Sequence, residues 1–129
     1  MMKYAYTLFF LVFIKSAFAF DIIDDVSATF KSGDAKAVAK YFSTTVELSV
    51  VDQEDIYSNA QATFILKDFF AKHPPIGIKI IHKVTSNPNY KFGVILLTTS
   101  NANYRVSFEL KSNASKFMLS QIRIEENKE

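Results

Sequence analysis

The chain has 129 residues, no cysteine, and a formal net charge of +2 from 15 lysine and arginine residues against 13 aspartate and glutamate residues. The absence of cysteine excludes disulfides, thiol chemistry, thiolate metal sites and a lipid anchor on cysteine. So small a net charge gives no electrostatic reason to expect binding to nucleic acid or to an anionic membrane.

The first nineteen residues have the pattern of a secretory signal peptide. Lys3 lies near the start, an apolar run covers residues 4–14, and the small residues Ala17 and Ala19 follow it. A cationic start, a short apolar core and small residues at the −3 and −1 positions are typical of a cleaved export signal. The apolar run is too short to span a bilayer, which needs about 20 residues.

We therefore predict a signal peptide over residues 1–19 and a single domain over residues 20–129. The expected location is periplasmic or extracellular after cleavage, without a membrane anchor. Lys3 and Lys15 both lie in the predicted signal, so the remaining basic residues balance the 13 acidic ones. The predicted domain is formally neutral, which again disfavours nucleic acid as a partner.

Two short helices are predicted to open the domain. Apolar residues recur at helical spacing over residues 21–32, and Gly33 stands where a helix stop is expected. Asp34 is suited to cap a second, shorter helix. A strand is predicted over residues 45–51, where apolar and polar residues alternate. The polar residues 52–55 are expected to form a solvated turn.

The clearest helix start in the chain follows that turn. Ser58 and Gln61 have the spacing of a capping box. Pro74 marks the end of the helix, because proline disfavours helical geometry in the residue before it. The apolar stripe of this helix is expected to comprise Ala62, Ile65, Leu66, Phe69 and Phe70.

Four alternating segments separated by short turn sequences complete the chain. Connections this short require adjacent strands to be antiparallel. The fold class is therefore α+β, with helices packed on a curved antiparallel sheet in the order α-α-β-α-β-β-β-β. The four predicted strands cover residues 76–84, 90–99, 103–111 and 116–125.

Alternation also predicts which face of the sheet each side chain occupies. We expect Leu110 to lie opposite Met118, Leu96 opposite Val106, and His82 opposite Phe92, with all six turned inward. The residues between them then form an apolar patch on the outer face, which we expect to be a homodimer interface or, failing that, the binding surface of another protein. The predicted interface residues are Ile81, Ile95, Leu97, Phe117 and Leu119.

Segments spread along the predicted domain carry a family resemblance: Lys31–Ala35, Tyr57–Ala62, Lys67–Phe70, His82, Asn103–Val106 and Gln121–Glu125. Through them the chain resembles an uncharacterised exported family of Bacteroidetes, known as domain of unknown function 4783. The resemblance covers nearly all of the predicted domain and implies the cone-shaped nuclear transport factor 2-like fold of the cystatin-like superfamily. It implies no activity, because this fold serves enzymes, transport adaptors and assembly modules alike.

Few side chains of the predicted inner face are suited to catalysis. His82 is the one group there that titrates near neutral pH, and no carboxylate is predicted beside it, so we assign no catalytic residue. His73 is expected to close a helix end. No spacing indicates a metal site, and no cofactor motif is present. The candidate pocket-lining residues are His82, Tyr90, Phe92, Tyr104 and Ser120.

The function predicted from the sequence is that of an exported, non-enzymatic module that binds a small apolar ligand or a partner protein. One alternative is a proton-transfer enzyme of the isomerase or hydratase type that uses His82 and Tyr104. Another is an assembly domain whose cone is filled by side chains. An open cavity beside His82 favours a ligand or a reaction, whereas a filled interior favours assembly.

Overall fold

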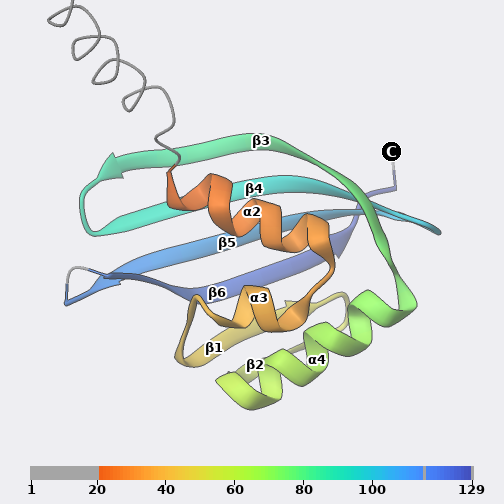
Figure 1. The fold of residues 1–129 in the computed structure, drawn as a ribbon, viewed down its shortest axis with the longest axis horizontal. Helices are drawn as coiled ribbons and strands as arrows, with labels where there is room; N and C mark the ends of the chain where they lie inside the picture. Colours follow the sequence, from red (N-terminus) through yellow and green to blue (C-terminus); the bar gives the residue numbers. More distant parts are fainter. Residues whose placement is uncertain (1–20, 115, 129) are drawn as a thin grey trace, which may run out of the picture.

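A computed structural model describes residues 21–114 and 116–128, so the predicted signal peptide and Phe20 lie outside the described residues. Helices come first, interrupted by a β-hairpin, and long strands follow (Figure 1). The elements are α2 (Ile22–Ser32), α3 (Ala35–Ala39), β1 (Phe42–Val50), β2 (Gln53–Ser58), α4 (Asn59–Lys72), β3 (Pro75–Asn87), β4 (Tyr90–Thr99), β5 (Asn103–Asn113) and β6 (Lys116–Glu126).

The described strands form one curved sheet in the order β2-β1-β6-β5-β4-β3. The pairing of β1 with β6 is parallel, and the other pairings are antiparallel. The helices α2, α3 and α4 lie on the same, concave side of the sheet (Figure 1). The α+β class and the antiparallel meander predicted from the sequence are confirmed.

Local signals set the helix boundaries, and those predicted at Gly33, Asp34 and Ser58 are confirmed. The Asp21 side chain caps α2 by accepting a hydrogen bond of 2.9 Å from the Asp24 backbone N–H. Gly33 ends α2 with a φ of 68°, a left-handed conformation that costs glycine little. Ser58 and Gln61 form a reciprocal capping box at the start of α4.

The polar segment after β1 is a strand, so the prediction of a solvated turn over residues 52–55 was wrong. Only Val51 and Asp52 form the connection between β1 and β2, and Val51 has a φ of 55°. Its backbone N–H donates to the Ile124 carbonyl at 2.8 Å, which ties the hairpin to β6. Because β2 is almost entirely exposed, its sequence carries no apolar alternation.

The predicted facing of β4 was also wrong. Gly93, Ile95 and Leu97 point toward the helices, so Phe92 and Leu96 point to the outer face. A bulge after Ile80 changes the register between β3 and β4, and His82 lies opposite Val94 rather than Phe92.

A bulge also shifts the pairing of β5 with β6. Leu110 lies opposite Leu119 instead of Met118, and Val106 lies opposite Ile124. Inserting one residue on one strand of a pair moves every later partner, which simple alternation does not anticipate. The β4–β5 pair has no such irregularity, yet Leu96 of β4 lies opposite Arg105 rather than Val106, so the predicted register of this pair was wrong by one residue throughout.

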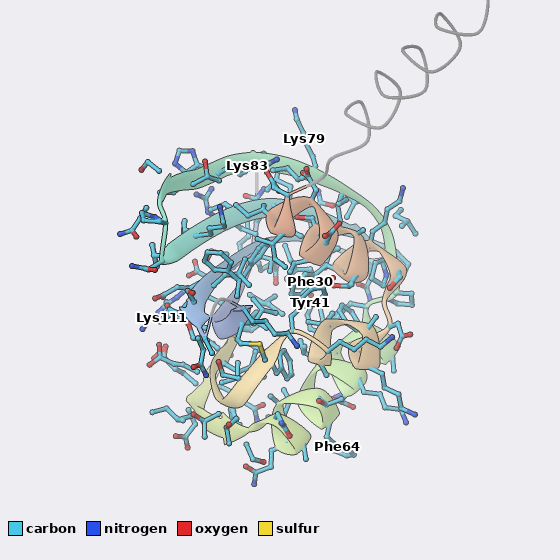
Figure 2. All side chains as sticks on the ribbon, turned by 60° about the vertical axis from the view of Figure 1, so that its left-hand side comes forward. Phe30, Tyr41, Phe64, Lys79, Lys83 and Lys111 are labelled. Carbon is cyan, nitrogen blue, oxygen red and sulfur yellow. The ribbon has the colours of Figure 1, made fainter. Side chains whose placement is uncertain are left out.

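The core fills the space between the helices and the concave face. Phe30 stacks on Phe108 at 6.0 Å between ring centroids and meets Phe70 edge-on at 6.2 Å. Figure 2 shows Phe30 between helix and sheet, whereas Phe64 points away from the core. Within residues 21–114 and 116–128, no helix has the length and hydrophobicity that a membrane crossing requires.

Candidate functional site

The interior of the cone, where the candidate pocket-lining residues were placed, is packed by aromatic side chains. Phe30, Phe70 and Phe108 occupy its centre, and Phe69 meets Tyr104 edge-on at 5.0 Å between ring centroids. All five side chains are buried. Ligand binding inside the cone would require these rings to move, at the cost of close-packed contacts.

The predicted pocket-lining residues do not come together. Tyr104 is buried on the concave side, as expected, but His82 is exposed on β3. Phe92 lies on the opposite face of the sheet, Tyr90 is half-buried at the start of β4, and the Ser120 hydroxyl bonds to the Glu109 carbonyl at 3.4 Å. The pairing of His82 with Tyr104 that the enzyme alternative requires is therefore absent.

The predicted outer patch is not formed by the residues assigned to it. Ile95, Leu97 and Leu119 are fully buried in the core. Phe117 packs against the core with the Lys91 ammonium 5.2 Å from its ring centroid, and Ile81 is 37% exposed. The reason is the inverted facing of β4 together with the bulge in β6.

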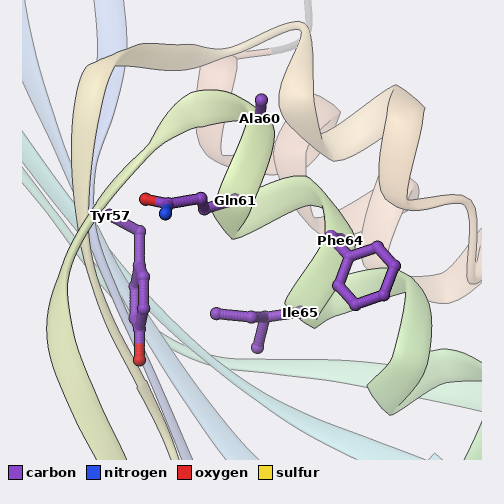
Figure 3. A pocket seen from close by; sticks show the side chains of 5 residues that line it. All are labelled: Tyr57, Ala60, Gln61, Phe64 and Ile65. Carbon is purple, nitrogen blue, oxygen red and sulfur yellow. The ribbon is translucent and has the colours of Figure 1, made fainter.

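Several surface hollows lie around α4. One of 390 Å³ lies between the end of β2 and the start of α4, lined by Tyr57, Ala60, Gln61, Phe64 and Ile65 (Figure 3). Phe64 is 72% exposed and also lines a hollow of 600 Å³ toward the start of α3. An exposed phenylalanine flanked by hollows on both sides is the shape of a recognition surface.

Local structure explains why this hollow forms. The capping box at Ser58 turns the chain from β2 directly into α4, so the strand and the helix diverge from one point. Tyr57 pairs with Val46, whose buried side chain marks the concave side, and it therefore faces Ile65 of the helix. Figure 3 shows Tyr57 and Ile65 on either side of the opening, with Phe64 at its rim.

Another hollow, of 300 Å³, lies next to the 390 Å³ hollow on the side of α4 that faces β2. Ile65 lines both of these hollows. The 300 Å³ hollow is the more polar of the two, because Gln53, Asp68 and Lys72 contribute to its wall, and Asp68 and Lys72 form an ion pair of 3.0 Å. Its remaining lining residues are Val50, Val51, Phe69 and His73.

His73 closes the far end of this hollow. Its Nδ1 lies 2.8 Å from Asn101 Oδ1 and 3.2 Å from the Tyr104 hydroxyl. The Asn101 amide donates to the Lys72 carbonyl at 3.2 Å, which satisfies a carbonyl at the end of α4. Burial, together with the charge of Glu126, raises the pKa of Tyr104. This cluster ties the helix end to the β4–β5 turn.

The described residues offer little for catalysis or metal binding. His73 contacts an amide and a phenol rather than a carboxylate. Within residues 21–114 and 116–128, no three histidine, cysteine, aspartate or glutamate side chains gather as a metal site requires. What the α4 surface can do chemically is bury apolar side chains and pair with charged ones.

This surface was not predicted from the sequence, although the sequence contains one signal for it. Phe64 falls outside the apolar stripe of its helix, and a phenylalanine off the core-facing stripe is a candidate for contact with another molecule. The contribution of β2 had no such signal, since that strand was not predicted.

Solved structures with this architecture support the fold. The chain is similar to a protein from Bacteroides uniformis at a TM-score of 0.80 and 24% identity, covering 84% of this chain and 100% of that one. A protein from Bacteroides ovatus gives a TM-score of 0.77 and 28% identity, covering 81% and 94%. Both are described as members of the domain of unknown function 4783 family.

More distant structures share the fold alone. A protein of unknown function with a cystatin-like fold from Nostoc punctiforme gives a TM-score of 0.64 at 8% identity, covering 81% of this chain and 72% of that one. The architecture is thus that of the nuclear transport factor 2-like and cystatin-like folds.

No curated protein is similar enough to count as a match. The sequence model of one family matches residues 23–125, which is nearly the whole described chain. The chain therefore belongs to the family designated domain of unknown function 4783.

Proposed function

We propose that this protein is an exported, non-enzymatic binding module that receives a partner protein on the surface around Phe64. The observation that carries the proposal is the exposure of Phe64, 72% of which is open to solvent beside the hollow formed with Tyr57 and Ile65. Burying a phenylalanine of this kind contributes about 1.5–3 kcal/mol, enough to anchor an interface.

The packed interior favours a protein partner over a small apolar ligand. A ligand in the cone would displace the stacked rings of Phe30 and Phe108. The hollow beside Phe64 is largely open to solvent, whereas a small-molecule site buries most of its ligand. A side chain projecting from another protein suits such a depression better.

Site-specific crosslinking in the native host tests this function. A photoreactive phenylalanine analogue at position 64 is expected to give a discrete adduct with one partner. The matched control carries the same analogue at Ile76, an apolar residue that is 67% exposed and lies outside the hollows around α4. Identical adducts from both positions, or none from position 64, would contradict the proposal.

Self-assembly is the second candidate, because a filled cone is also what an assembly domain requires. The two functions differ in oligomeric state. A partner-binding module is expected to remain monomeric in light scattering at high micromolar concentration. An assembly domain is expected to increase in mass with concentration.

A further inference from the structure

The two hollows on the hairpin side of α4 form one continuous depression. They share Ile65, and their lining follows the helix row Gln61, Ile65, Asp68 and Lys72. Opposite this row lies the concave side of β2, where Gln53 and Tyr57 line the polar and the apolar end. We call this depression the β2–α4 groove.

β2 is also one of the two edge strands of the described sheet, and β3 is the other. Among the described strands it pairs with β1 alone, and the sheet order places nothing on its other side. Such an edge offers backbone N–H and C=O groups to which an extended segment can add as a further strand. At this edge the Ser58 N–H is bonded to Gln61 Oε1 at 3.1 Å and the Ile56 N–H to Asp55 Oδ1 at 2.8 Å, so an added strand that pairs with Ile56 must take the place of the Asp55 side chain. A strand added here would have α4 beside it and the groove beneath its concave-facing side chains.

The charged side chains on and beside β2 favour one kind of bound segment over another. Glu54 pairs with Arg123 at 3.5 Å, and Asp68 pairs with Lys72 at 3.0 Å. Asp52 and Asp55 are exposed and form no ion pair within the described chain. A second copy of this edge would bring Asp52, Glu54 and Asp55 against their own equivalents, whereas a basic segment complements them.

We infer that the partner docks as an extended segment on the free edge of β2, with an apolar side chain beside Tyr57 and Phe64 and a lysine or arginine beside Asp55. This inference rests on the proposed function. The two partner residues are two positions apart, because Tyr57 and Asp55 share one face of β2 and side chains alternate along a strand. Backbone pairing supplies affinity, and the two side chains supply selectivity.

Selection from a phage-displayed library of random octapeptides tests the inference without a known partner. Wild-type protein is expected to enrich sequences with an apolar residue and a lysine or arginine two positions apart. Asp55→Lys is expected to weaken binding of a selected fluorescein-labelled peptide by about tenfold or more, measured by anisotropy. Asp25→Lys makes the same charge change at an exposed position of α2 and is expected to leave affinity unchanged.

Backbone pairing has its own readout. Methylating alternate backbone nitrogens of the selected peptide removes the donors on one of its edges and keeps every side chain, so one of the two methylated series is expected to lose binding. In the complex, the β2 amides are expected to gain protection from hydrogen exchange. Both readouts distinguish an added strand from a peptide that merely contacts Phe64.

The outcomes separate this inference from the proposed function. Binding that is lost in Phe64→Ser but unaffected by Asp55→Lys and by both methylated series overturns strand addition and leaves Phe64 as the binding surface. No enrichment of octapeptides also overturns strand addition, while crosslinking at position 64 decides the proposed function separately. A free protein that dimerises with protected β2 amides would make a second copy the occupant.

Discussion

Gly93 of β4 lies directly against the ring of Phe108 on β5. A Cβ atom on Gly93 would lie 2.8 Å from Cζ of Phe108 and 3.0 Å from Cγ2 of Ile23 on α2. The absence of a side chain at this position lets the helix and the aromatic ring meet over the strand. This contact turns the Gly93 side of β4, with Ile95 and Leu97, toward the core.

Gly93→Ala is therefore expected to destabilise the protein by about 1–3 kcal/mol, because the added methyl overpacks a filled site. Urea titration measures the change in the free energy of unfolding. Gly77→Ala is the matched control, since no atom lies within 4 Å of a Cβ built there, and it is expected to change stability by less than about 0.5 kcal/mol. Equal effects of the two substitutions would contradict this account of the packing.

The same contact explains why the facing of β4 was not predictable from alternation. Residues 94–97 are all apolar, so neither face of the strand is marked. The residue that distinguishes the two faces is Gly93. Its role follows from its contacts with Phe108 and Ile23, both of which are far from it in the sequence. The outer-patch prediction failed with it, because it placed Ile95 and Leu97 on the wrong side.

Elements defined by nearby residues were predicted well. The capping box of Ser58 and Gln61 and the stop at Gly33 depend on residues within one turn of each other. The positions of the bulges depend on how two strands fit together. The edge strand β2 is almost entirely exposed, so its sequence shows no apolar alternation that would predict a strand. The candidate site at β2 and α4 thus arises from the tertiary arrangement, with Phe64 its only signal in the sequence.

Replacing Phe69 by alanine is expected to cost about 3–5 kcal/mol of stability. Phe69 is buried and contacts the rings of Phe70, His73 and Tyr104, so truncation leaves a cavity at the end of α4. Phe64→Ala is the control on the same helix, and its exposure predicts little change in urea titration. A cost below about 1 kcal/mol for Phe69→Ala would contradict the prediction and would mean that neighbouring side chains close the cavity without strain.

Export is expected to remove the first nineteen residues. The small residues Ala17 and Ala19 place the cleavage site before Phe20. N-terminal sequencing of protein recovered from outside the cytoplasm measures the processed end. Recovery of a soluble periplasmic protein that begins at Met1 would contradict the prediction.

Lys83 connects the bulged edge strand β3 to the start of α2. Its ammonium lies 3.0 Å from an Asp21 carboxylate oxygen and 2.8 Å from one of Asp24. Burial acts to raise the pKa of Asp21, but the Asp24 backbone N–H and the Lys83 ammonium outweigh it and hold that pKa below its usual value. The carboxylates of Asp24 and Asp21 in turn raise the pKa of Lys83.

The lowered pKa predicts how stability depends on pH. A carboxyl group whose pKa is lower in the folded state stabilises the protein above its unfolded pKa, about 3.9 for aspartate, and loses this effect as pH falls through the folded value. Asp21→Asn keeps a good helix cap but removes the charge. The stability difference between wild type and Asp21→Asn, measured by urea titration, is expected to be constant above about pH 5 and to shrink as pH falls below about 4.

Asp25→Asn removes a carboxylate from the same turn without touching Lys83, and so controls for the helix dipole. A difference between wild type and Asp21→Asn that does not vary with pH would show that the contact with Lys83 contributes nothing in solution.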